Sequence, residues 1–214
     1  MIKTKQLLHK GGFYPYSIHT QRTEKLDNGL SNLKQFLEHV FHACPDQYFN
    51  SGPRSSTLKT VLPFDIIEIQ GHEVSALAEM GLEENKERVN NNHMRVQLFM
   101  LEHDPGTIAM EVPLWMQHHE LDNYVDIFKT IEPLTGHVDI LRKENEHIWI
   151  WDYKPNAKKE KYASTQVYFY ALMLSKRTGI PLEHIRCGWF DHKDAFLFKP
   201  KTLSIPFNKA LHHY

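Results

Sequence analysis

The sequence has few cysteines, no long apolar run and no excess of either charge. Cys44 and Cys187 are its only cysteines and stand far apart, which excludes a disulfide framework, a CxxC zinc pair and a four-cysteine iron–sulfur ligand set. No run of 18 apolar residues predicts a membrane-spanning helix, and the first residues lack the apolar core of a signal peptide. We therefore expect a cytoplasmic protein with free thiols and no membrane partner.

The composition is that of a folded domain. Hydrophobic residues make up 41% and charged residues 24% of the 214 residues, which is too apolar for general disorder. The net charge of −1 does not decide whether nucleic acid is bound, because clustering of Lys and Arg matters more than their sum. The 15 histidines are scattered, without the HExxH or paired spacing of a zinc site. We expect most of them at the surface.

The order of the predicted elements indicates an α/β fold. Helices are predicted where apolar residues recur at helical spacing: 30–43, 72–80, 82–102 (after a break at Gly81) and 162–178. Strands are predicted at 107–115, 134–141, 148–153, 185–190 and 195–198. Residues 1–28 carry several turn signals and are expected to be irregular or lightly structured. The type of the apolar segment 61–69 stays open.

These elements predict a central mixed β-sheet flanked by helices. The length suits a single domain over residues 1–214. Within it we expect a mostly helical N-terminal part (1–106), a core (107–198) and an extended tail (199–214).

The strand at 148–153 ends in an acid and a lysine. Side chains alternate along a strand, so Asp152 and Lys154 share a face with isoleucines, while Trp149, Trp151 and Tyr153 occupy the other face. We expect these aromatic side chains to pack against a helix. An acid and a lysine on an apolar face are costly to bury unless they form a pair or hold a metal. Taken alone, Asp-x-Lys is most often a structural salt bridge.

A second acid strengthens the metal hypothesis. Asp139 lies near the end of the preceding strand, and the turn between them has the right length to bring it beside Asp152. Two carboxylates are suitable ligands for Mg²⁺ or Mn²⁺, and Lys154 could then orient or deprotonate a metal-bound water, or offset charge on a phosphate. Gly136 permits the close approach of a ligand or is an ordinary turn residue.

The helix that follows places Gln166 and Tyr170 on one face, four residues apart. This spacing is common in any helix. Because this pair directly follows Asp-Tyr-Lys, the spacing is a stronger indication of function. The two side chains could hydrogen-bond a DNA phosphate or the strand ends near the metal.

In this order, Gly136-x-x-Asp139, Asp152-Tyr153-Lys154 and Gln166-x-x-x-Tyr170 resemble the PD-(D/E)XK nuclease superfamily, in particular its RecB-type (QxxxY) branch. The resemblance covers about residues 107–198 and implies a restriction-endonuclease-like core. It implies metal ligation by Asp139, Asp152 and the Tyr153 carbonyl, catalysis by Lys154, and a DNA path along Gln166 and Tyr170.

The resemblance also implies further ligands. Glu111 matches a glutamate found on the preceding strand in this family, although it could be an ordinary strand-end charge. An upstream helix in many relatives supplies another ligand, for which His93 is best placed and Glu87 and His72 compete. A nitrogen ligand would favour Mn²⁺. The second acid is Asp where the family often has Glu, and the missing cysteines imply a branch without an iron–sulfur cluster.

The basic cluster after Asp152 has two interpretations. Lys158 and Lys159, which belong to it together with Lys154 and Lys161, either contact phosphates or form a solvated loop.

The resemblance implies a metal-dependent deoxyribonuclease. Its expected substrate is single-stranded DNA or duplex ends, in recombination, repair, or phage or defence DNA metabolism, alone or within a larger complex. The alternatives are an inactive nucleic-acid-binding module on the same fold, and a plain α/β protein whose acids and lysine form a salt-bridge network. DNA against RNA, and exonuclease against endonuclease, stay open.

Overall fold

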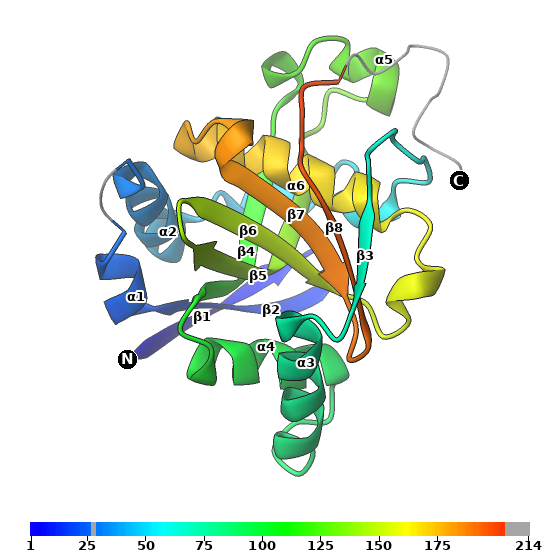
Figure 1. Cartoon of the computed structure of the whole chain (residues 1–214). Coiled ribbons are helices and arrows are strands. Elements are labelled where there is room, and N and C mark those ends of the chain that lie inside the picture. Colours follow the sequence, from blue (N-terminus) through cyan, green and yellow to red (C-terminus); the bar gives the residue numbers. More distant parts are fainter. Residues whose placement is uncertain (27–28, 204–214) are drawn as a thin grey trace.

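The computed structural model describes residues 1–26 and 29–203, so most of the predicted extended tail lies outside the described residues. Its centre is one eight-stranded mixed sheet in the order β1-β2-β4-β5-β6-β7-β8-β3 (Figure 1). The strands are β1 (Ile2–His9), β2 (Gly12–His19), β3 (Ile67–Gln70), β4 (Thr107–Met116), β5 (Leu134–Glu144), β6 (His147–Tyr153), β7 (Ile185–Phe190) and β8 (Asp194–Phe198). Within this sheet β6 and β7 pair in parallel and the other neighbours pair antiparallel.

Helices cover both faces of the sheet. The α-helices are α1 (Thr20–Glu24), α2 (Ser31–Ala43), α3 (Glu73–Glu84), α4 (Asn92–His103), α5 (Tyr124–Phe128) and α6 (Ala163–Thr178). Short 3₁₀ turns are η1 (Asp46–Phe49), η2 (Ser55–Thr57), η3 (His118–Glu120), η4 (Ala157–Lys159) and η5 (Leu182–His184). Figure 1 shows α6 across one face and the α3–α4 pair against the other. The predicted mixed sheet with flanking helices is confirmed.

The two faces of β6 bury different side chains, as its alternation predicts. Ile148 and Ile150 belong to the large core that includes α2 and α6, whereas Trp151 and Tyr153 belong to the smaller core with α3 and α4. Trp149 is half-buried at the margin of that smaller core and stacks on Trp151, with ring centroids 5.1 Å apart. The predicted packing of these aromatic residues against helices is confirmed.

The prediction that residues 1–28 are irregular is wrong. β1 and β2 form an antiparallel hairpin whose residues pair from Ile2–His19 to His9–Gly12. β1 lies at one edge of the sheet, and its side chains Lys3, Thr4 and Gln6 are exposed. These polar residues hide the alternation of apolar and polar positions by which a strand is predicted. The turn at Gly11 and Gly12 adopts φ angles of 103° and 141°, which glycine reaches without strain.

The predicted helix break at Gly81 is also wrong, because α3 continues to Glu84 and the break comes at 85–91. A Cβ on Gly81 would come 2.8 Å from the Cβ of Phe99 and 3.1 Å from the Arg95 carbonyl oxygen. The glycine therefore lets α3 and α4 pack closely. No helix in the described part of the chain is long and apolar enough to cross a bilayer.

Candidate functional site

Three adjacent strands bring three carboxylates into one row. The β4–β5 register pairs Met110 with Ile140 and Val112 with Val138, which sets Glu111 opposite Asp139. The β5–β6 register pairs Ile140 with Trp151, and its next step sets Asp139 opposite Asp152. The Tyr153 backbone N–H donates to Asp139 Oδ2 at 2.8 Å. The predicted proximity of Asp139 and Asp152 follows from this pairing.

Glu111 enters the row through an unusual backbone. Its φ is +51°, in the left-handed region that non-glycine residues seldom adopt, although it lies within β4. Gln97 of α4 donates from Nε2 to Glu111 Oε1 at 2.7 Å, which fixes the carboxylate on the side of α4. A strained residue whose side chain is held toward a polar cluster is typical of a functional site.

Asp152 is held by two groups from different elements. Lys154 Nζ lies 2.6 Å from Oδ2, and Gln166 Nε2 donates to Oδ1 at 3.0 Å and approaches the Tyr170 hydroxyl at 2.9 Å. The contact with Lys154 lacks hydrogen-bond geometry, so the buried Oδ2 atom is left without a hydrogen-bond partner. Gln166 and Tyr170 thus orient an acid from α6, which is one of the two roles open to them from the sequence.

The carboxylates outnumber the cations beside them. Burial raises the pKa of Asp139 well above its usual range, and the neighbouring Asp152 and Glu111 raise it further. Burial likewise raises the pKa of Glu111 to about 7, with Asp152 adding to the effect and the Gln97 hydrogen bond opposing it. Burial lowers the pKa of Lys154, but Asp152 and Asp139 outweigh this and keep its ammonium protonated. Without a cation the cluster therefore retains protons that full ionisation of the three acids would release.

A divalent cation fits this cluster. Hard oxygen ligands suit Mg²⁺ or Mn²⁺, and Asp152 Oδ2, which contacts Lys154 Nζ and has no further partner among the described residues, retains lone pairs for an ion. Asp139, Asp152 and Glu111 could hold such an ion, together with the Tyr153 carbonyl implied by the family resemblance. The charge of the ion would offset the repulsion that raises the pKa values of the acids.

The carboxylates lie in a hollow of about 550 Å³. Its lining includes the predicted residues His93, Glu111, Asp139, Asp152, Lys154, Gln166 and Tyr170. Asp152 is only 1% exposed, so a substrate phosphate must enter the hollow to reach the acids.

Of the three upstream candidates, His93 alone lines this hollow. Its ring lies edge-on to the Tyr153 ring, with centroids 5.1 Å apart. Burial lowers the pKa of His93, opposed by the nearby Asp152 carboxylate, so the imidazole is neutral at pH 7 and can offer a lone pair. His72 instead caps α3, where its Nδ1 accepts from the Val74 N–H at 3.2 Å, and Glu87 does not line the hollow.

The lysine cluster after Asp152 lies outside the hollow. Lys158 Nζ lies 2.7 Å from Glu68 Oε1 of β3, and neither Lys158 nor Lys159 lines the hollow, so their contact with nucleic acid stays a prediction.

A Cβ on Gly136 would come 2.3 Å from Tyr170 Cε1 and 2.4 Å from Ser55 Oγ. Gly136 thus admits the Tyr170 ring against β5 rather than a ligand.

The sequence did not indicate three other residues of the hollow: Arg54, Gln97 and His137. Gln97 lies one turn after His93 on α4, and His137 is two residues before Asp139 on the same side of β5, so helical and strand spacing could have found both. Arg54 lies in a loop rich in Ser, Gly and Pro, where no periodicity points to it.

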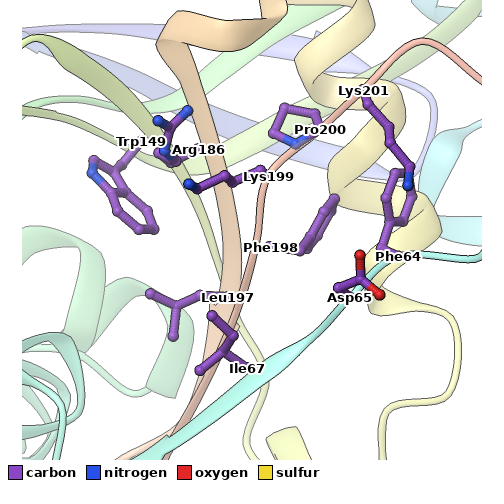
Figure 2. Close-up of a pocket in the computed structure, with 10 residues that line it drawn as sticks. All are labelled: Phe64, Asp65, Ile67, Trp149, Arg186, Leu197, Phe198, Lys199, Pro200 and Lys201. Atoms are coloured by element: carbon purple, nitrogen blue, oxygen red, sulfur yellow. The ribbon is translucent and has the colours of Figure 1, made fainter.

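A second hollow, of about 440 Å³, lies near the β8–β3 edge of the sheet (Figure 2). Figure 2 shows Phe64, Phe198, Leu197 and Ile67 at its wall, with Trp149 and three cationic side chains around them. Asp65 is the only acid among its ten lining residues. It therefore lacks the grouped carboxylates that would hold a divalent ion.

Sequence comparison agrees with this geometry. No curated protein matches the chain. A family model described as the PD-(D/E)XK nuclease superfamily matches residues 16–205, which span β2 to β8 and include every residue of the carboxylate row. The chain belongs to the PD-(D/E)XK nuclease superfamily.

Proposed function

We propose that this protein is a Mg²⁺- or Mn²⁺-dependent deoxyribonuclease of the RecB type that cuts single-stranded DNA or duplex ends. The observation that carries the proposal is the row Glu111, Asp139 and Asp152 beside Lys154 in one hollow, with Asp139 and Asp152 buried and Glu111 half-buried. Full ionisation of these three acids beside one lysine is unfavourable unless a cation binds there.

The residues have distinct roles in this proposal. Asp139, Asp152, Glu111 and the Tyr153 carbonyl hold the ion, and His93 adds a nitrogen ligand at the rim. The bound ion supplies polarisation of the scissile phosphate and a water of lowered pKa. Lys154 remains protonated between Asp152 and Asp139, so it stabilises the charge that develops on the phosphate rather than accepting a proton.

Gln166 supports the assignment to the RecB-type branch. Its amide binds Asp152 Oδ1 and the Tyr170 hydroxyl at once, which fixes the second acid of the row. Such support for a ligand is ordinarily worth 10–100-fold in metal affinity or activity, as an order of magnitude.

The depth of the acids supports a preference for single strands and ends. Asp152 and Asp139 are almost fully buried at the base of the hollow, so the strand must leave its partner to place a phosphate there. Arg54 and Lys154 line the same hollow and carry the positive charge that a backbone phosphate requires. A closed duplex offers no such free strand.

The test compares matched substrates under Mg²⁺ and Mn²⁺: linear single strands, linear duplex and covalently closed circular duplex, each as DNA, and a linear RNA. We expect degradation of linear DNA and resistance of the closed circle, with no activity in Asp152→Asn or Lys154→Ala. Equal residual activity in wild type and both variants would indicate the alternative, an inactive binding module. Rapid relaxation of the closed circle would contradict the preference for ends and single strands while leaving a nuclease.

A further inference from the structure

A second group of ligating side chains lies outside the carboxylate row. His9 ends β1, Cys44 directly follows α2, and Asp46 begins η1. One ligand atom from each of the three lies within 4.8 Å of the others. His9 Nε2 is 2.9 Å from Asp46 Oδ1 and 3.9 Å from Cys44 Sγ. Residues far apart in the sequence therefore converge on one point.

We propose that His9, Cys44 and Asp46 form a zinc site with a fourth position open to water. Thiolate, imidazole and carboxylate together are a ligand set typical of Zn²⁺, whereas Mg²⁺ avoids sulfur. Tetrahedral bonds of 2.0–2.3 Å set ligand atoms about 3.3–3.6 Å apart. The observed 2.9 and 3.9 Å bracket this spacing, so small side-chain shifts complete the geometry.

A buried histidine supports the site from behind. His9 Nδ1 lies 2.8 Å from Nε2 of His137, and histidine ligands ordinarily use their second nitrogen in such a bond. The His9 ring stacks on Phe49 with centroids 4.0 Å apart, and the His137 ring stacks on Tyr14 at 3.7 Å. These contacts hold His9 in the orientation that presents Nε2 to Cys44 and Asp46.

The group is reachable from solvent. The His9 side chain is 1% exposed and the Asp46 side chain 54% exposed, so the group meets solvent on the side of Asp46. Cys44 is half-buried between them. An ion can enter past Asp46 and keep one water, as a three-ligand site allows.

The site would tie three segments together and connect them to the carboxylate row. It links the β1–β2 hairpin to the end of α2, and His137 is both the partner of His9 and a wall residue of the hollow. When Zn²⁺ binds His9 Nε2, the neutral His9 ring carries its proton on Nδ1. His9 Nδ1 then donates the hydrogen bond and His137 Nε2 accepts it. His137 Nδ1, which is buried without a partner, then carries the remaining proton of that ring.

The experiment uses Co²⁺ as a spectroscopic substitute for Zn²⁺ in the tag-free full-length protein. We expect one equivalent to give the thiolate-to-cobalt charge-transfer band and the intense d–d bands of a tetrahedral site, and Zn²⁺ to displace it. Cys44→Ala should remove the charge-transfer band, and Asp46→Ala should weaken binding at least about tenfold. The double variant Asp139→Asn/Asp152→Asn is the matched control and should keep all of the bands.

Thermal unfolding gives a second readout. Zn²⁺ at 100 times its Kd should raise the Tm of the Asp139→Asn/Asp152→Asn variant, in which the carboxylate row is disabled, by roughly 5–10 °C, and adding Cys44→Ala to that variant should remove the rise. The proposal is overturned if the wild type shows no charge-transfer band, if Cys44→Ala keeps it, or if the Asp139→Asn/Asp152→Asn variant loses it. None of these outcomes depends on nuclease activity, so failure here leaves the proposed function standing.

Discussion

Two buried carboxylates near β5, Asp104 and Asp139, have opposite surroundings. Asp104 is 2% exposed, and both of its oxygens accept hydrogen bonds from Arg142, at 2.7 and 3.1 Å. The Thr107 hydroxyl and the Gly106 N–H complete its shell. Asp139 is also buried, at 9% exposed, but it accepts from the Tyr153 N–H and lies near two more acids.

The different partners of the two acids indicate different roles, structural for Asp104 and functional for Asp139. At Asp104 a buried acid meets a buried guanidinium with two-point geometry, so its charge is balanced inside the protein. At Asp139 the charges are left unbalanced, which is unfavourable for folding and useful for binding a cation. β5 thus contributes Arg142 to a balanced pair and, three residues earlier, Asp139 to the proposed ion site.

The largest expected difference between the two acids is in catalysis, and it is measured by neutralising each acid and following cleavage of single-stranded DNA. Asp139→Asn keeps the volume and the contact with the Tyr153 N–H, yet we expect it to lower kcat/KM by about 10³-fold or more, or ~4 kcal/mol of transition-state stabilisation. Asp104→Asn serves as the control at a temperature where it is folded, and should stay within about threefold of wild type. A similar loss in both variants would mean that Asp139 acts only through the fold.

The same two variants should move stability in opposite directions. Asp104→Asn leaves the buried Arg142 guanidinium with only the exposed Glu73 carboxylate as an ion-pair partner, so we expect the free energy of unfolding to fall by about 3–5 kcal/mol. Asp139→Asn removes a repelled charge, so in EDTA at pH 8 it should unfold no more easily than wild type. Urea denaturation of the three proteins measures this, and destabilisation of both variants by equal amounts would contradict the distinction.

The sequence alone was sufficient to predict that Asp139 and Asp152 lie close together, because the two residues are near each other along the chain. Asp139 and Asp152 lie on strands joined by a short turn, and strand alternation fixes their faces. Helix α6 follows directly, so Gln166 and Tyr170 could be placed beside them. The fold class followed from the same alternation of helical and strand periods.

What could not be predicted depends on distant contacts. Gln97 reaches Glu111 only because α4 packs on β4, and His9 reaches His137 across 128 positions of the sequence. The histidines therefore looked scattered, although His9 and His137 are buried together. The β1–β2 hairpin was missed because one strand is a polar edge, and Gly81 was misplaced because close helix packing and a helix break both favour glycine.

The stability of the protein should also depend on pH through Glu111 of the carboxylate row. In EDTA, the pKa of Glu111 is about 7 when folded, against 4.5 for an ordinary glutamate. A raised folded pKa means that the protonated acid favours the folded state, so this stability is full below pH 4.5 and is lost as pH rises through 7. We expect a loss on the order of 2–3 kcal/mol between pH 5 and 8.

The control for this slope is Glu111→Gln, whose unfolding free energy should vary less over the same range. Addition of Mg²⁺ or Mn²⁺ to the wild type should restore stability at pH 8, because the ion binds the ionised acids of the folded state. A slope that is identical in wild type and Glu111→Gln would assign the effect to other groups.

The smallest expected effect concerns the two amides that support the row. Gln166→Ala removes the hydrogen bond to Asp152 and the link to Tyr170, and should weaken activity about 10–100-fold, mainly through a higher metal concentration at half-maximal rate. Gln97→Ala removes the single bond to Glu111, whose strained backbone already directs it inward, so its loss should be nearer tenfold. Titrating the cleavage rate of both variants with metal distinguishes two roles of these amides. If excess Mn²⁺ restores neither rate, the amides contact the substrate and do not act by orienting the acids.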